Sequence, residues 1–277
     1  MTRLRIDTSN PRTFERLVKE GRGQGVGEGY KPWLTVRDLS SRGESTRLTS
    51  WRTGSRPVHV FSKLERDFFY TLEWDPTVVD CREQFPLDLE VTLRIAKELN
   101  IKHPVSPETQ LPVPMTTDFV TTRKAGDDFS EQAYSVKPLV EVELQGSKRA
   151  RRVKRTLDKL AIEHEYWRQQ RTTWALVTEQ DFNRVLSRNV RMVHGFYHLQ
   201  SLAPLTEPEV NAIHNRMYPQ VVTGNASLAD LASSTDAALG LPSGKSLAVA
   251  KHLIARRRWL VDFSREFNPS YPIILCS

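Results

Sequence analysis

Hydrophobic and polar positions along the first two thirds of the chain switch between a helical and a strand-like spacing. Leu64, Phe68 and Leu72 recur every four residues, which is typical of one face of an α-helix. Runs rich in Val, Thr and aromatic residues separate such segments, and prolines and Gly-Asp steps mark breaks. The pattern predicts, in order, a helix over 62–76, a strand over 77–89 with a turn at Pro86, a helix over 89–101, a proline-rich loop over 103–114, strands over 115–123 and 132–144 with a hairpin break at 125–128, a helix over 151–172 and a strand over 173–182. This order favours an α/β domain with a mixed sheet flanked by helices.

The pattern changes near residue 184, where helical spacing replaces the alternation. Helical segments cover 206–221, 227–240 and 244–260, and two short β-like runs at 259–263 and 271–277 close the chain. We therefore expect an α/β domain over 57–183. A small, mainly helical, winged-helix-like domain follows over 184–277.

Positive charge is concentrated near the N-terminus. The net charge is +7, and residues 1–56 hold twelve Lys or Arg against six Asp or Glu. This segment is rich in Gly, Ser and Thr, so we expect a basic arm that is solvated and partly disordered. Arginines of such an arm can also lie on a phosphate backbone, and the two interpretations are compatible. The candidates for DNA contact are Arg47, Arg52 and Arg56.

Other features narrow the class of protein. No run of about 18 apolar residues is present, so no membrane span is expected. The opening residues, MTRLRIDTSN, lack the apolar segment of a secretory signal. Cys81 and Cys276 offer neither a disulfide framework nor a zinc site. We expect a cytoplasmic protein that associates with the nucleoid when it is assembled on DNA.

A lysine interrupts the predicted strand QAYSVKPLVEVEL. A charge in a core strand is costly unless it is paired or binds something. Alternate strand residues share a face, so Ser135 and Lys137 point the same way, and Asp118 lies in the middle of the preceding strand. An acidic residue on one strand and a lysine on the next is the arrangement of the metal-dependent restriction-endonuclease-like fold. Taken singly, a snorkelling lysine and an Asx turn are the commoner explanations.

Glu65 is the candidate for a second carboxylate at such a site. It lies at the start of the first predicted helix, where Ser62 and Glu65 have the spacing of a capping box. The spacing alone favours the capping role over metal binding, and both alternatives stay open.

Several blocks of the sequence together resemble one protein family. FSKLERDFFYTLEWDPTVVDCREQFPL, IKHP, MTTDF, VKP and RTLDKLAIEHEYW resemble TnsA, the endonuclease subunit of heteromeric transposases, over about residues 58–182. The resemblance implies a restriction-endonuclease-like nuclease whose catalytic residues are Glu65, Asp118 and Lys137. It also implies that Glu65 and Asp118 bind magnesium, which manganese can replace. With this resemblance, metal binding becomes the better explanation for Glu65.

The resemblance implies accessory residues and partners as well. Glu163 matches a family glutamate, and Ser135 stands where some members have Gln, although a serine reaches less far toward a metal. TnsA-like subunits cut the 5′ strands at transposon ends, while a DDE transposase, TnsB, cuts and joins the 3′ strands. A regulatory AAA+ ATPase, TnsC, contacts the pair, and the second domain of TnsA is expected to bind partners, chiefly TnsC.

Two other functions also fit the sequence. One is a non-catalytic DNA-binding scaffold subunit whose carboxylates are structural. The other is a stand-alone restriction-type nuclease that needs no partners. For Arg256, Arg257 and Arg258, which would cover most of one helical turn, a solvated face, a partner surface and phosphate contact remain open.

Overall fold

Two units make up the chain, residues 1–182 and 183–277, and each is described by itself. The computed structural model describes residues 3–4, 6–40, 45–54, 56–143 and 150–276. Residue 144, at the end of the predicted lysine strand, and residue 277, at the end of the last β-like run, lie outside the described residues. Within the described chain, no helix combines the length and the apolar composition needed to cross a bilayer.

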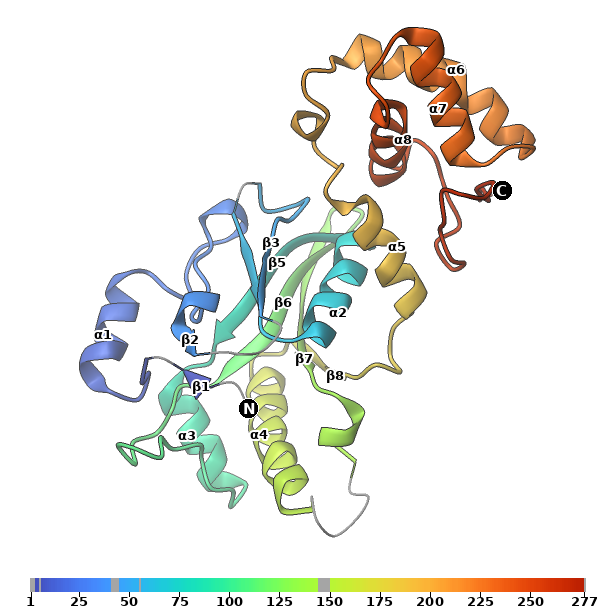
Figure 1. Ribbon diagram of the computed structural model, residues 1–277. Helices are drawn as coiled ribbons and strands as arrows, with labels where there is room; N and C mark the ends of the chain where they lie inside the picture. Colours follow the sequence, from blue (N-terminus) through green and yellow to red (C-terminus); the bar gives the residue numbers. More distant parts are fainter. Residues whose placement is uncertain (1–2, 5, 41–44, 55, 144–149, 277) are drawn as a thin grey trace. The chain divides into compact units, whose positions relative to one another are not determined.

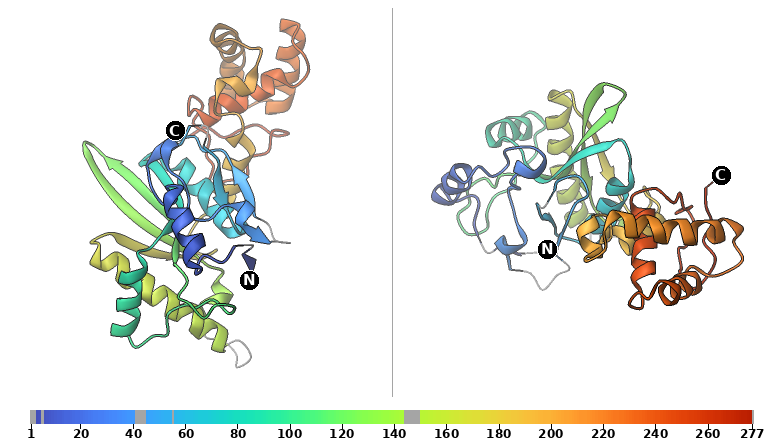
Figure 2. Two further views of the ribbon diagram at one scale, coloured as in Figure 1. Left: turned by 90° about the vertical axis from the view of Figure 1, so that its left-hand side faces the viewer. Right: turned by 90° about the horizontal axis from the view of Figure 1, so that it is seen from above.

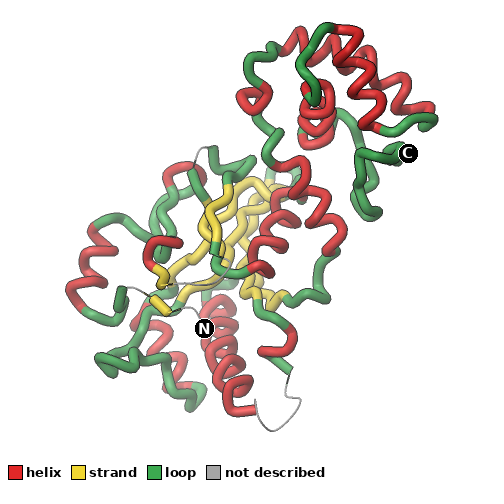
Figure 3. Tube along the Cα trace, in the orientation of Figure 1, coloured by secondary structure: helices red, strands yellow, loops and turns green. Residues whose placement is uncertain are grey.

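A four-stranded mixed sheet forms the centre of the first unit (Figures 1 and 3). Its strands, in spatial order, are β5 (Val78–Pro86), β6 (Thr116–Ala125), β7 (Asp128–Val136) and β8 (Thr173–Val177). β6 runs antiparallel to both neighbours, whereas β8 runs parallel to β7. A tight turn containing Gly126, at φ +64°, joins β6 to β7, and this hairpin reaches beyond the rest of the sheet (Figure 2). The mixed α/β architecture expected from the sequence is confirmed.

Helices cover both faces of this sheet, and they are α2 (Lys63–Trp74), α3 (Leu89–Glu98) and α4 (Ala150–Gln169). Phe68 of α2 packs edge-to-face on Phe119 of β6. Val120, the next residue of β6, lies in a different cluster with Ile95 of α3 and Ile162 of α4. Neighbouring strand residues point to opposite faces, so α2 covers one face and α3 and α4 cover the other.

The helix starts follow from capping side chains that the sequence supplies. The hydroxyl of Ser62 accepts the Glu65 backbone N–H at 3.1 Å, at the start of α2. The carboxylate of Asp88 accepts the Val91 N–H at 2.9 Å, at the start of α3. The predicted helices over 62–76, 89–101 and 151–172 are therefore confirmed, with ends that differ by a few residues.

The described part of residues 1–56 belongs to the first unit and is not a separate arm. Its elements are β1 (Arg3–Leu4), α1 (Pro11–Lys19), the 3-10 turns η1 (Gly27–Gly29) and η2 (Val36–Asp38), β2 (Leu39–Ser40) and β3 (Thr46–Leu48), and β3 pairs with β4 (Val58–Val60). Leu17, Tyr30 and Trp33 of this segment are buried. Burial of these large apolar side chains orders a segment whose composition alone predicts a solvated arm.

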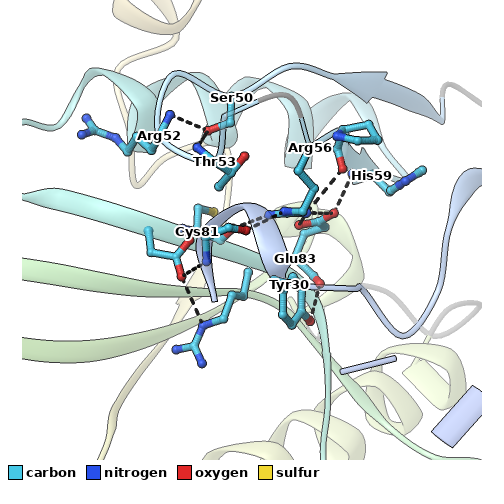
Figure 4. A network of polar contacts seen from close by, with 12 residues as sticks. Tyr30, Ser50, Arg52, Thr53, Arg56, His59, Cys81 and Glu83 are labelled. Atoms are coloured by element: carbon cyan, nitrogen blue, oxygen red, sulfur yellow. Dashed lines mark hydrogen bonds and ion pairs between the residues drawn. The ribbon is translucent and has the colours of Figure 1, made fainter. Parts of the chain in front are cut away.

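Arg56 ties this segment to the central sheet (Figure 4). Its guanidinium donates to both carboxylate oxygens of Glu83 in β5, at 2.9 and 2.8 Å, and to the Cys81 carbonyl at 2.9 Å. The Tyr30 hydroxyl donates to the Glu83 carbonyl, and the His59 N–H donates to the Glu83 carboxylate. Glu83 is 0% exposed, so its charge is buried and is balanced by these donors.

The second unit is mainly helical. It contains α5 (Arg184–His194), the 3-10 turn η4 (Leu199–Leu202), α6 (Glu207–Thr223), α7 (Leu228–Leu239) and α8 (Lys245–Ala255). The sequence predicted the last three helices but not α5, whose residues are mostly polar. α8 ends at Ala255, so Arg256 begins a non-helical segment that was predicted to be helical up to residue 260. In place of the predicted terminal hairpin, the described residues of the two closing runs meet at a single bridge, between Val261 and Leu275.

Candidate active site

Asp118 and Lys137 meet where β6 and β7 separate. The pairing of these two strands ends at Phe119 and Tyr134. Beyond that pair, Oδ2 of Asp118 accepts the Val136 backbone N–H and the Lys137 ammonium, each at 2.7 Å. The aspartate side chain therefore takes the place of a strand partner, and this departure from regular pairing brings a carboxylate and a lysine into contact.

Lys137 lies just past the end of its strand and not inside it. β7 ends at Val136, and a 3-10 turn, η3 (Leu139–Glu141), follows Pro138, which cannot donate to a ladder. The strand predicted over 132–144 was therefore wrong in its second half. The Lys137 N–H still bonds the Val177 carbonyl of β8 at 2.9 Å, which fixes the backbone. Its side chain is 30% exposed, so the ammonium can reach a ligand.

The charge of Lys137 is stabilised by its neighbours. Burial acts to lower the pKa of the ammonium, but the carboxylates of Asp118 and Glu65 outweigh that effect and raise the pKa above its usual value. The lysine is therefore protonated at neutral pH. In this arrangement it is a positive charge and hydrogen-bond donor held against Asp118.

Glu65 combines the two roles that the sequence left open. One carboxylate oxygen accepts the Phe61 N–H at 2.9 Å, while the Glu65 N–H donates to Ser62, so the residue helps to cap α2. The side chain is also close to the lysine–aspartate pair. Burial and the charge of Asp118 raise the pKa of Glu65 to about 7, and Lys137 partly offsets them.

Glu163 of α4 approaches the same point from the opposite face of the sheet. It is 5% exposed, and its Oε1 accepts hydrogen bonds from the hydroxyls of Thr117, at 2.6 Å, and Ser135. Those hydroxyls in turn accept the indole N–H groups of Trp167, at 2.8 Å, and Trp174, at 3.1 Å. This clamp holds the carboxylate in one orientation, and burial followed by the charge of Asp118 raises the pKa of Glu163 to about 7.

Ser135, an accessory candidate from the sequence, is thus a positioning residue. Its hydroxyl is used between Trp174 and Glu163, so it orients a carboxylate and is not itself turned to a ligand. Sequence reasoning missed the roles of Thr117, Trp167 and Trp174. Thr117 and Trp167 lie in the blocks MTTDF and RTLDKLAIEHEYW that carry the family resemblance, whereas Trp174 lies outside those blocks.

Two carboxylates each keep one oxygen that makes no hydrogen bond to the described residues, and Glu65 lies beside them. The two oxygens are Oδ1 of Asp118 and Oε2 of Glu163. No three His, Cys, Asp or Glu side chains of the described chain gather closely enough to hold one ion. Mg²⁺ typically takes one or two carboxylates and keeps several waters, so a pair of these oxygens suits it.

A cavity of about 260 Å³ opens beside the lysine. Lys137 and Glu163 line it together with Lys159 of α4 and Glu141. Glu141 is paired with Arg152 at 2.8 Å, so its charge is balanced. The cavity gives an extended ligand access to the ammonium and to the clamped carboxylate.

Two of the three arginines expected to contact DNA bind acceptors within the protein. Arg56 is buried on Glu83, and Arg52 donates to the backbone carbonyls of Glu73, at 2.8 Å, and Asp75, at 2.6 Å. Arg47 of β3 is exposed. The structure therefore assigns structural contacts to Arg52 and Arg56, because each guanidinium meets protein acceptors that composition could not reveal.

Comparison with known proteins agrees with this architecture. Residues 75–179 match the family described as TnsA-like endonuclease N terminal, a range that includes Asp118, Lys137 and Glu163. Residues 181–263 match the family described as TnsA endonuclease C terminal. The chain is 35% identical over 264 residues to the transposon Tn7 transposition protein TnsA of Escherichia coli, covering 94% of this chain and 89% of that protein. This chain therefore belongs to the TnsA family of transposition endonucleases.

Proposed function

We propose that this protein is the metal-dependent DNA endonuclease subunit of a cut-and-paste transposase and hydrolyses the 5′, non-transferred strands at transposon ends. Family membership supports the endonuclease class. The observation that carries the proposal is the contact of the Lys137 ammonium with the Asp118 carboxylate, beside the buried carboxylate of Glu65. The same geometry supports a restriction-endonuclease-like fold for the first unit.

The donor set fits magnesium, with manganese as a substitute. Carboxylate oxygens are the ligands that hard divalent cations prefer, and Asp118 with Glu65 would hold the ion. The pKa values of Glu65 and Glu163, both about 7, reflect burial and the negative charge of Asp118, which a divalent cation would offset. When bound, the ion supplies Lewis-acid stabilisation of the negative charge that develops on the phosphate.

The protein's own residues bind the phosphate, orient the attacking water and accept its proton. Lys137 holds a positive charge at the mouth of the cavity, where it would bind a phosphate oxygen and orient the attacking water. Water forms a bond to phosphorus as the bond from phosphorus to the leaving sugar oxygen breaks. The attacking water must lose a proton, and the leaving oxygen takes one up from solvent. Glu163, whose clamped carboxylate lines the same cavity as Lys137, is the group we assign to accept the proton of the water.

The relative's identity as a Tn7 transposition protein supports a set of partners. We propose transposon-end DNA, a TnsB-like DDE transposase that cuts the 3′ strands, and a TnsC-like AAA+ regulator. The second unit, whose helices α6–α8 precede an antiparallel bridge, is proposed as winged-helix-like and as the partner-binding part. The assembly would work on DNA in the nucleoid.

Strand-resolved cleavage of a labelled transposon end, with magnesium and the partner transposase, tests the proposal. Asp118→Asn should abolish the 5′ cut and leave the 3′ cut, while Asp127→Asn, in the exposed β6–β7 turn, should cut like wild type. Magnesium should also raise the melting temperature of wild type and of Asp127→Asn, because the ion binds the folded protein and not the unfolded chain. It should not raise that of Asp118→Asn, which lacks the proposed carboxylate ligand.

Each other outcome points to a different function. If Asp118→Asn cuts normally, the carboxylates are structural and the protein is a DNA-binding scaffold. If wild type cuts both strands without any partner, it is a stand-alone nuclease.

A further inference from the structure

A basic hollow lies along the first half of α4, beside the candidate site. Its volume is about 570 Å³. Its charged lining residues are Lys102, Arg151, Lys154, Arg155 and Asp158. The four that belong to α4 have the spacing of a single helix face, so four cations and one carboxylate gather on one surface.

This hollow adjoins the cavity at Lys137. One short segment of chain separates them: Pro104 lines the cavity, whereas Lys102 and Val105 line the hollow. The Arg155 guanidinium donates to the Lys102 carbonyl and so holds that segment against the helix. α4 also contacts the turn that follows β7, and Figure 1 shows the two side by side.

Lys159 links the hollow to the cavity. It follows Arg155 by about one turn of α4, a rise of about 6 Å, and lines the cavity with Lys137. Burial and then the positive charges of Arg155 and Lys137 lower the pKa of Lys159, which agrees with a row of neighbouring cations. By contrast, Arg152 is paired with Glu141. Within the described chain, Lys159 makes no ion pair, so the row is open to an external anion.

We propose that this row, Lys102, Arg151, Lys154, Arg155 and Lys159, holds consecutive phosphates of the DNA strand that is cut. We call it the α4 track. This proposal rests on the proposed nuclease function. It identifies the surface that delivers the scissile phosphate to Lys137. A row of cations that ends at a reactive centre fits an extended polyanion better than a single phosphate. Such contacts position DNA and do not read its sequence.

DNA binding by the full-length protein tests the track, with the divalent cation removed so that no cleavage occurs. The variant Arg151→Ala/Lys154→Ala removes two exposed cations of the track, and Arg12→Ala/Lys19→Ala removes two exposed cations of α1 as a matched control. The probe is a fluorescent duplex of arbitrary sequence, titrated over a series of salt concentrations. For the track variant, the slope of log affinity against log salt should fall by about 1.8. The control should keep the wild-type slope.

Lys159→Met extends the test to the reacting phosphate. It keeps the aliphatic stem and removes the charge, and we expect 5′ cleavage to slow about ten-fold while the melting temperature is unchanged. An unchanged salt slope for the track variant, or a wild type that does not bind the duplex at low salt, overturns the proposal. An acidic protein as the true occupant would give the first of these results.

The results expected if the nuclease proposal is wrong differ from those expected if the α4 track is wrong. Asp118→Asn would then cleave like wild type, whereas the reduced salt slope of the track variant would still establish the DNA surface.

Discussion

One carboxylate oxygen, Oδ2 of Asp118, binds both the Lys137 ammonium and the Val136 amide, each at 2.7 Å. A side chain thereby ends the pairing of two strands and fixes the position of a charge in a single arrangement. The position of the Lys137 ammonium therefore depends on where β7 ends as well as on the conformation of its own side chain. A change in the backbone at the end of β7 would move the charge.

Loss of the Lys137 charge should stop catalysis without unfolding the protein. For Lys137→Met we expect 5′ cleavage to fall by at least about 10²-fold, since a positioned group of the reaction is removed. Single-turnover cleavage of a labelled end measures this. Lys124→Met, on the exposed part of the β6–β7 hairpin, is the control and should cleave normally. A Lys137→Met protein as active as wild type would contradict the role given to the ammonium.

Two substitutions at the start of α2 separate capping from catalysis. Ser62→Ala removes the hydroxyl that accepts the Glu65 N–H, so it should cost about 1 kcal/mol of unfolding free energy and leave cleavage intact. Glu65→Gln keeps an oxygen for the Phe61 N–H but removes the charge, so cleavage should be lost.

The stability of Glu65→Gln should rise relative to wild type at alkaline pH. The folded pKa of about 7 lies above the usual value for glutamate, so the stability contributed by Glu65 is complete below the unfolded pKa and is lost as pH rises through about 7. Glutamine does not titrate and escapes that loss. Urea unfolding of wild type and Glu65→Gln over a series of pH values measures this difference in stability. Cleavage assays of Ser62→Ala and Glu65→Gln test the separate roles, and equal cleavage by these two variants would contradict them.

Removing Arg56 should destabilise the protein strongly and leave its DNA binding unchanged. Arg56→Met strands the buried Glu83 carboxylate without its cation, which typically costs about 3–5 kcal/mol. Arg56→Met/Glu83→Gln should recover part of that loss, because no unpaired charge remains. Denaturant unfolding and the salt dependence of DNA binding are the measurements. A mild loss of stability with a lower salt slope would restore Arg56 to the DNA surface.

His59 should make the protein less stable in mild acid. Burial, followed by the charges of Arg47 and Arg56, lowers the pKa of His59 to about 4, and its Nδ1 accepts the Val36 N–H at 3.2 Å. The unfolded chain takes up the proton more readily, so stability is full above about pH 6.5 and is lost as pH falls toward about 4, by at most about 3 kcal/mol.

His59→Asn supplies an acceptor that does not titrate. Its unfolding free energy should change less between about pH 7 and about pH 5 than that of wild type. Parallel pH profiles for the two proteins would show that this histidine is not the titrating group.

The parts of the fold and site that follow from sequence are those with local signals. Apolar spacing located the helices and strands between residues 62 and 177 but none of those before residue 62, and a Ser-x-x-Glu spacing located the start of α2. Asp118 and Lys137 were found because each stands out in a short strand-like run. Lys137 was predicted to lie inside a strand, whereas β7 ends at Val136 because Pro138 cannot donate to the ladder.

The features that were missed depend on contacts between distant residues. Trp167 bonds Thr117 from 50 positions away, and Arg56 meets Glu83 across 27. Until its partner is known, an arginine in a Gly- and Ser-rich stretch has the composition of a solvated arm. Long-range pairing of this kind decides whether a charge is a ligand contact or part of the core.

The anchoring of Arg56 on Glu83 also sets the limits of a usable fragment. A catalytic fragment cut at residue 57, where composition suggests a border, would expose the apolar surface that Tyr30 and Trp33 cover and leave Glu83 charged inside β5. Such a fragment should aggregate on expression, whereas one that retains the N-terminal segment and ends near residue 182 should purify as a folded unit. Affinity tags and fusion partners are for the same reason better attached beyond the second unit than in place of the first fifty residues.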